Sequence, residues 1–310
     1  MFGRLRVKEL KLKCYESNEI AVYIWDEVEN PRGIVQILHG MAEWCPRYDN
    51  FAKFLNSHGY IVIGDDHRGH GQTSGYSNKG CVEGDSFPDT VEDVYCINEY
   101  AKTTYKLPIL LFGHSYGSFL AQAYISKYGF SICGVILSGT AYMNRGLVHA
   151  GNLLAGTIYG LLGADAPAKL IDKMTFEAYN KPFESEDLKN AWLTRDRKEV
   201  VKYLNDKFCG HVMSYGFQAS FFRGILRVST KSAMSKIPKD LPIYITGGDK
   251  DAVGENGKLP TKLCEKYKKL GINRVEIKLY PDARHEILNE INRDEVYSDI
   301  LGFINSVFEK

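Results

Sequence analysis

A serine flanked by glycines is the residue in this 310-residue chain whose setting most favours chemistry. Ser115 lies at the centre of a G-x-S-x-G pattern at 113–117, directly after an apolar run at 109–112 and directly before a helix-like stretch at 118–128. A very tight strand-to-helix turn exposes such a serine and requires small flanking residues, and the helix N-terminus faces any anion that forms beside it. The pattern therefore predicts a nucleophile at Ser115; the alternative is an ordinary glycine-rich turn.

A serine hydroxyl attacks efficiently only when a neighbouring base removes its proton and a third group holds that base. His285 follows a β-rich run near the end of the chain, and Asp249 and Asp251 follow the apolar run before it. Parallel strands present their carboxyl ends at one edge of the sheet, where such folds bind ligands. We expect His285 to take the proton from Ser115 and one of the two aspartates to fix the imidazole tautomer.

The tetrahedral intermediate of such a reaction requires two backbone donors aimed at its oxyanion. One expected donor is the amide of Tyr116, the residue after the nucleophile. The other should come from the loop at 39–44, which follows an early apolar run, and we expect the amide of Met41 to supply it. The methionine side chain would then form part of the pocket wall.

The elements that must position these residues are short apolar or β-rich runs, separated by segments of helical period. The runs lie at 20–25, 34–38, 60–63, 109–112, 134–137, 241–246 and 275–279. Their alternation with helices predicts a mostly parallel sheet with helices on both faces. We also expect residues 5–14 and 20–25 to pair as an antiparallel hairpin, and the alternating run at 275–279 to lie near the sheet edge.

One interval between strands is too long for a simple crossover. Residues 139–240 lie between the apolar runs at 134–137 and 241–246, whereas a parallel crossover needs only about a dozen residues or more. The interval begins with a Gly- and Leu-rich piece at 146–154. We interpret it as inserted helices that cover a ligand; an ordinary second helical subdomain is the alternative.

Composition and charge exclude several classes of protein. Hydrophobic residues make up 44% of the chain and charged residues 25%, and the net charge is +1, which argues against disorder, coiled coils and a nucleic-acid partner. Residues 1–8 carry charge where a secretory signal would be apolar, and no charge-free run is long enough to span a bilayer, so we expect a cytoplasmic protein. Seven scattered cysteines without a C-x-x-C pair predict reduced thiols.

Several short sequence blocks, taken in their order along the chain, resemble those of a known family. The chain is similar to proteins of the α/β-hydrolase fold and, within it, to the monoacylglycerol lipase and lysophospholipase-like serine hydrolases. The matching blocks are HGMAEW at 39–44 with a downstream RY at 47–48, DHRGHGQT at 66–73, GHSYG at 113–117, GDKD at 248–251 and HEIL at 285–288. The resemblance implies a mostly parallel eight-stranded sheet with helices on both faces and a helical cap inserted after the sixth strand. The implied bounds are a core of 1–138 and 236–310 and a cap of 139–235.

The resemblance also implies roles for individual residues. The acid of the family is the last residue of G-x-x-D, which favours Asp251 over Asp249. Glu43 is expected to orient the oxyanion loop without donating protons. Arg47 and Tyr48 are expected to anchor the start of a helix.

The implied activity is cleavage of a carboxylic ester through an acyl-Ser115 intermediate, with a monoacylglycerol or lysophospholipid as the small-molecule substrate. Short-chain carboxylesterases and, more distantly, prolyl-type aminopeptidases are the enzymatic alternatives. A non-catalytic ligand-binding fold would usually lack a triad member, and none is missing here. No cofactor and no metal are expected, because the loop of His67 and His70 is structural in this family. The cap is expected to touch lipid surfaces transiently through Leu153 and Leu154.

Overall fold

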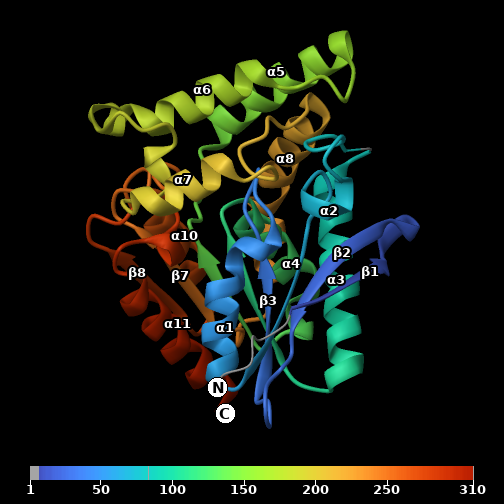
Figure 1. Cartoon of the computed structure of the whole chain (residues 1–310), viewed down its shortest axis with the longest axis vertical. Coiled ribbons are helices and arrows are strands. Elements are labelled where there is room, and N and C mark those ends of the chain that lie inside the picture. The colour runs from blue at the N-terminus through green and yellow to red at the C-terminus, as the bar shows by residue number, and fades with distance from the viewer. Residues whose placement is uncertain (1–6, 83, 310) are drawn as a thin grey trace.

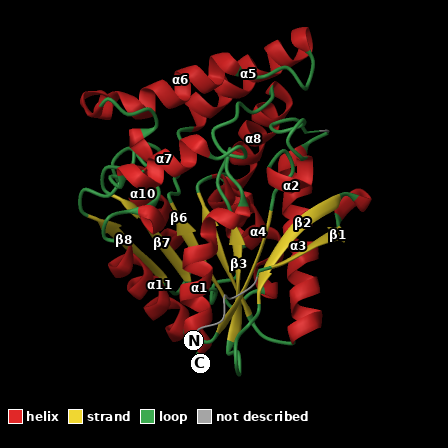
Figure 2. Cartoon of the chain, in the orientation of Figure 1, coloured by secondary structure: helices red, strands yellow, loops and turns green. Residues whose placement is uncertain are grey.

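The computed structural model describes residues 7–82 and 84–309, and its centre is an eight-stranded sheet (Figures 1 and 2). The strands are β1 (Lys8–Lys13), β2 (Glu19–Trp25), β3 (Gly33–Leu38), β4 (Tyr60–Asp65), β5 (Ile109–His114), β6 (Gly134–Ser138), β7 (Ile243–Gly248) and β8 (Val275–Tyr280). Their order is β1-β2-β4-β3-β5-β6-β7-β8. The pairs β1–β2 and β2–β4 are antiparallel, and the other neighbours are parallel. The predicted mostly parallel sheet is confirmed.

Both ends of the sheet agree with the sequence. β1 and β2 form the expected hairpin, with Leu10 opposite Val22; Leu5 and Arg6, which we placed in its first arm, lie outside the described residues. β8 is the last strand of the sheet and, unlike the fully buried β7, it is partly exposed along its length. The alternation of side chains across a strand explains why an edge strand shows this mixed pattern.

Helices cover both faces of the sheet, as expected from strands that are apolar on both sides. Ile34 and Leu38 of β3 pack in the core cluster shared with α3 and α4, whereas Val35 and Ile37 pack in the cluster shared with α1 and α11. The helices of the two layers are α1 (Asp49–Ser57), α3 (Ser86–Tyr105), α4 (Tyr116–Tyr128), α10 (Lys258–Lys269) and α11 (Arg293–Phe308). A four-residue helix, α2 (Gly71–Ser74), follows β4.

The long interval between β6 and β7 is helical. It contains α5 (Arg145–Leu162), α6 (Lys169–Asn180), α7 (Arg197–Asn205), α8 (Tyr215–Val228) and α9 (Lys231–Ser235). Figure 1 shows α5 and α6 lying across the end of the molecule toward which the parallel strands point. A small core of its own, with Ala155 of α5, Ile171 of α6 and Ala219 of α8, holds these helices together. Within the described part of the chain, none of the helices combines the length and the apolar character needed to cross a membrane.

The cysteines require a correction. Cys14, directly after β1, and Cys96, in α3, form a disulfide with a Cα–Cα distance of 5.7 Å, so the prediction of reduced thiols is wrong for this pair. The other five cysteines are free. Because the two partners are 82 residues apart in sequence and meet only where α3 packs beneath the hairpin, local spacing gave no signal for their pairing.

Candidate active site

Ser115 lies on a strained turn between β5 and α4. Its backbone has φ 51° and ψ −117°, a conformation that a non-glycine residue rarely adopts and that marks functional turns. The flanking glycines make the turn possible, because a Cβ atom on Gly113 would lie 2.5 Å from the carbonyl oxygen of Gly117, and one on Gly117 would lie 2.1 Å from that of Leu38. The hydroxyl of Ser118 donates to the carbonyl of Ser115 at 2.6 Å and fixes the first turn of α4.

Asp251 and His285 lie side by side in the loops after β7 and β8. The Nδ1 atom of His285 is 2.9 Å from Oδ1 of Asp251, and both side chains are almost fully buried. Since a carboxylate can only accept, Nδ1 carries the proton and Nε2 is the basic nitrogen of the neutral ring. Gly248 allows the two loops to meet, because a Cβ there would lie 1.9 Å from the carbonyl oxygen of Ala283.

The environment of His285 keeps its imidazole basic. Burial lowers the pKa of His285, but the charge and hydrogen bond of Asp251 outweigh that effect. The pKa of His285 is therefore raised above its ordinary value. The ring lies between Trp192 and His114, with centroid distances of 5.0 and 4.8 Å. Its Nε2 atom is buried and has no hydrogen-bond partner within residues 7–82 and 84–309. The basic nitrogen is thus held in place and left free to accept a proton.

Asp249, the other candidate acid, points elsewhere. Its Oδ1 atom accepts a hydrogen bond from the amide of Asp282 at 2.7 Å and lies 3.7 Å from the Lys250 ammonium, and its side chain is 38% exposed. The geometry therefore supports Asp251 as the partner of His285.

The loop at 39–44, which we expect to carry an oxyanion donor, is held by side chains that the sequence did not indicate. The amide of Ala42, next to Met41, donates to Nε2 of His70 at 3.1 Å, and the hydroxyl of Tyr203 donates to the carbonyl of Ala42 at 3.1 Å. Burial lowers the pKa of His70, which keeps its ring neutral and able to accept. No sequence signal indicated this role of His70, because the role depends on how the loop after β4 packs against the loop after β3.

Ser115, His285, Met41 and Tyr116 all line one cavity of about 620 Å³. Its remaining wall is mainly apolar and comes largely from the helical segment between β6 and β7, including Leu154, Ile171, Phe222 and Ile225. A cavity of this size and polarity is typical of a site for a small organic ligand. The structure therefore brings the sequence-predicted nucleophile, base and oxyanion donors to one apolar cavity.

The chain is similar to known proteins over most of its length. A family model described as "Serine aminopeptidase, S33" matches residues 29–292. The monoacylglycerol lipase of Mycolicibacterium smegmatis is 26% identical over 285 residues, which cover 91% of each chain. A monoglyceride lipase homolog of monkeypox virus is 28% identical over 284 residues, again 91% of each.

A solved structure is similar over nearly the whole length. The structure of a thermostable carboxyl esterase from Bacillus coagulans in complex with glycerol superposes with a TM-score of 0.89 at 28% identity, covering 98% of this chain and 100% of that one. The predicted resemblance is confirmed by the family model, the relatives and the solved structure. Because the family model spans most of its length, the chain, with its mostly parallel eight-stranded sheet, belongs to the serine aminopeptidase S33 family of α/β-hydrolases.

Proposed function

We propose that the protein is a serine hydrolase that cleaves the ester of a monoacylglycerol or a lysophospholipid. The observation that carries the proposal is the buried Asp251–His285 pair, because His285 lines the same apolar cavity as Ser115. The lipase names of the relatives and the glycerol-bound esterase support an ester substrate.

In the acylation step, Nε2 of His285 takes the proton from the Ser115 hydroxyl as the oxygen attacks the ester carbonyl. Asp251 holds the ring and stabilises the imidazolium that forms. The backbone amides of Met41 and Tyr116 bind the oxyanion of the tetrahedral intermediate. When the intermediate collapses, the C–O bond to the alcohol breaks, His285 gives its proton to the leaving oxygen, and the acyl group stays on Ser115.

In the deacylation step, a water molecule enters in place of the released alcohol. His285 removes a proton from that water as it attacks the acyl carbonyl, and the same amides bind the second oxyanion. Collapse returns the proton to the Ser115 oxygen and releases a carboxylic acid. No group other than substrate, water and the residues of this chain is required to balance either step.

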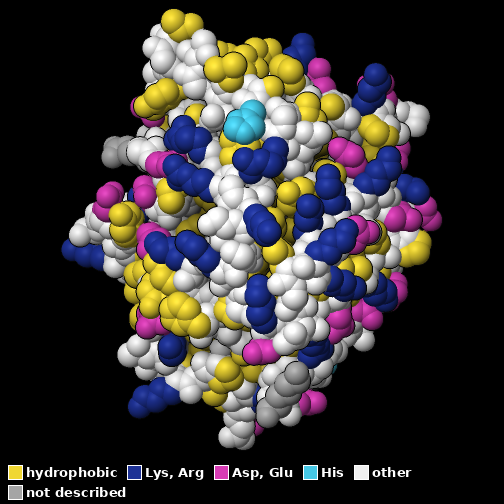
Figure 3. All heavy atoms as spheres, turned by 180° about the vertical axis from the view of Figure 1, so that it is seen from behind, with side chains coloured by type: hydrophobic (Ala, Val, Ile, Leu, Met, Phe, Trp, Pro, Cys, Tyr) yellow, Lys and Arg dark blue, Asp and Glu magenta, His cyan; other side chains and the backbone are white. Residues whose placement is uncertain are grey.

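Residues 139–235 form, in this proposal, a cap over the site, and 1–138 and 236–310 form the core. The cap supplies the apolar wall for an acyl chain, through side chains such as Leu154 and Phe222. Its outer side supports a transient contact with lipid, because Leu153, Leu161 and Leu162 of α5 are 66–78% exposed. Figure 3 shows hydrophobic side chains gathered at this end of the molecule.

The proposal is tested by hydrolysis of saturated esters from two to sixteen acyl carbons, with wild type and Ser115→Ala side by side. We expect a maximum at medium or long chains and a loss of at least about a thousandfold in the variant. A maximum at two to four carbons would identify a short-chain carboxylesterase. Turnover in the variant close to wild type would refute the serine mechanism.

A cytoplasmic location is part of the proposal and has its own test. The cytosol keeps thiols reduced, whereas oxidising compartments preserve disulfides. The Cys14–Cys96 disulfide of the structure therefore makes a direct measurement of location necessary, and fractionation of cells should recover the protein with cytosolic markers. Recovery with a secreted or membrane-enclosed fraction would contradict a cytoplasmic location.

A further inference from the structure

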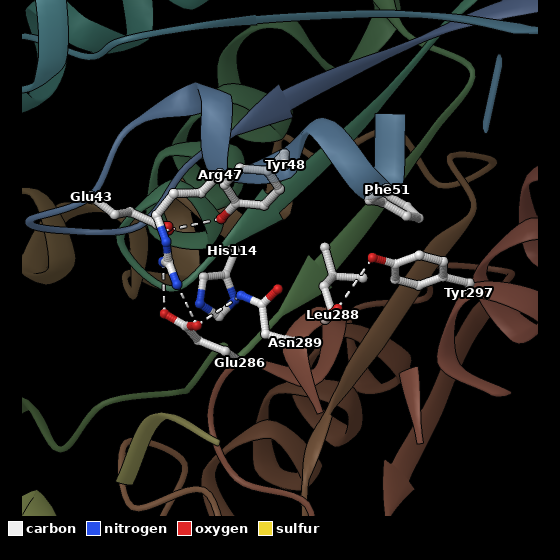
Figure 4. Close-up of a pocket in the computed structure, with 9 residues that line it drawn as sticks. All are labelled: Glu43, Arg47, Tyr48, Phe51, His114, Glu286, Leu288, Asn289 and Tyr297. Carbon is white, nitrogen blue, oxygen red and sulfur yellow. Dashed lines mark hydrogen bonds and ion pairs between the residues drawn. The ribbon is translucent and has the colours of Figure 1, made fainter. Parts of the chain in front are cut away.

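Three buried charged side chains beside the site have no part in the mechanism above. Figure 4 shows Arg47 between Glu43 and Glu286, around a cavity of about 10 Å³, which is roughly the size of one water molecule. Arg47 donates to both oxygens of Glu286, at 2.8 and 2.7 Å, and to Oε2 of Glu43. Both glutamates are at most 5% exposed. Arg47 does not simply anchor a helix, as the sequence suggested; its guanidinium joins two carboxylates.

One end of this bridge holds the oxyanion loop. The Oε1 atom of Glu43 accepts a hydrogen bond from the amide of Gly40 at 2.6 Å and another from the Tyr48 hydroxyl at 2.8 Å. Gly40 directly precedes Met41, whose amide is the proposed oxyanion donor. The expected orienting role of Glu43 therefore rests on a direct bond to the loop backbone.

The other end holds the loop of the general base. Glu286 directly follows His285, and its amide donates to the carbonyl of Leu193 at 2.7 Å. Its carboxylate also accepts from the side chain of Asn289 at 2.8 Å. Arg47 therefore fixes the side chain that is next to the base in sequence.

The sheet itself does not connect these two loops. The loops follow β3 and β8, and β5, β6 and β7 lie between those strands in the sheet. A series of contacts thus joins the loop of Met41 to the loop of His285 without passing through the strands. It runs from Gly40 through Glu43 and Arg47 to Glu286.

Stability alone is a poor explanation for such a cluster. Buried ion pairs contribute little net stability, because the cost of removing charges from water offsets their attraction. Burial by itself would raise the pKa of Glu286, but the charge and hydrogen bonds of Arg47 hold it well below its usual range. The cluster therefore keeps a carboxylate ionised close to His285, and that charge raises the pKa of the imidazole.

We propose that Arg47, through Glu43 and Glu286, is a positioning residue that sets the distance between the oxyanion donors and the base His285. It acts on the reaction without touching the substrate. The inference rests on the proposed hydrolase function and concerns how well the two halves of that site are aligned.

The first test is Arg47→Lys, which keeps the charge but cannot bind two carboxylates in the same planar geometry. A misplacement of about 1 Å in an active site can lower the rate about a hundredfold. We expect the rate constant kcat per fluorophosphonate-labelled site to fall about ten- to a hundredfold, with KM changed less than about threefold. The matched control is Arg68→Lys. Arg68 donates two hydrogen bonds to the carboxylate of Asp93, and its side chain is 11% exposed, as is that of Arg47.

The second test is Glu286→Gln, which keeps the size of the side chain and removes its charge. Because the Glu286 charge raises the pKa of His285, the acid limb of the kcat/KM profile should move to lower pH. The limb reports the charge, whereas kcat per labelled site at pH above the limb reports the alignment and should also fall, because the variant breaks the ion pair with Arg47. If the two residues act as one unit, the double variant Arg47→Lys/Glu286→Gln should have a kcat only slightly lower than that of the slower single variant.

The inference is overturned if folded Arg47→Lys retains kcat per labelled site within about threefold of Arg68→Lys. An unchanged kcat per labelled site in Glu286→Gln, measured at pH above the acid limb, would also overturn it, and this second variant decides if Arg47→Lys fails to fold. The outcome is separate from that of the proposed function. If wild-type Ser115 takes no label and hydrolyses no ester, the hydrolase proposal fails before the bridge is tested.

Discussion

The loops at the carboxyl ends of the strands and the helices α5 and α6 use their side chains in opposite ways. In the loops, polar groups are buried: His39, Asp251 and His285 are each at most 3% exposed. In α5 and α6, large apolar groups are exposed: Leu153 is 72% and Leu161 is 78% exposed. Both regions face the same cavity.

This difference indicates a division of labour. Buried polar groups with directional bonds fix the positions of atoms, which the chemistry of bond breaking requires. Apolar helices with exposed side chains offer contact area without fixed partners. Substitutions in the loops should therefore change the rate of the chemical step, and substitutions in α5 should change which acyl chains or surfaces the protein accepts.

The largest effect is expected in the loops, from Asp251→Asn. The variant loses the carboxylate that fixes the His285 tautomer, and we expect kcat to fall about 10³- to 10⁴-fold. Since Asp251 raises the pKa of His285, the residual activity should show an acid limb at lower pH. Asp249→Asn is the matched control and should stay within a few-fold of wild type. A pH–rate series measures both effects, and equal losses in the two variants would contradict the assignment.

A smaller effect is expected on the inner side of α5, from Leu154→Trp. Leu154 lines the cavity, so a larger side chain there should shorten the space for an acyl chain and shift the preferred ester to fewer carbons. The chain-length series measures the shift, with Leu161→Trp as a control on the exposed side of the same helix. An unchanged optimum in Leu154→Trp would place the acyl chain elsewhere.

The smallest effect is expected on the outer side of α5, from Leu153→Glu. If this leucine is buried in lipid, its loss should weaken binding to phosphatidylcholine vesicles roughly tenfold or more, while hydrolysis of a soluble ester is unchanged. Thr157→Glu adds the same charge at another exposed position of α5 and serves as the control. Co-sedimentation that is equal in both variants would remove Leu153 from the contact.

The sequence indicated those candidate site residues that lie directly after a strand. Position after an apolar run indicated Ser115, His285 and two candidate acids, because parallel strands bring those ends to one edge. Only the family resemblance favoured Asp251 over Asp249. The sequence predicted the same contact with lipid for Leu153 and Leu154, because it does not show which of two neighbouring leucines on a helix is exposed. The structure separates them into an exposed residue and a cavity residue.

Contacts between distant segments could not be predicted in this way. The Cys14–Cys96 disulfide and the Arg47–Glu286 ion pair each join residues that are far apart in sequence, and no local pattern marks either pair. Their partners are decided by how α3 packs beneath the hairpin and by how the loops after β3 and β8 meet. Such contacts follow from tertiary packing rather than from periodicity.

The central claim, an acyl intermediate on Ser115, is tested most directly by rapid quenching of the enzyme during ester turnover, followed by peptide mass analysis. We predict a single acyl adduct on the peptide that contains Ser115, formed within the burst phase and absent in Ser115→Ala. An adduct on another residue, or hydrolysis by Ser115→Ala at the wild-type rate, would contradict the account.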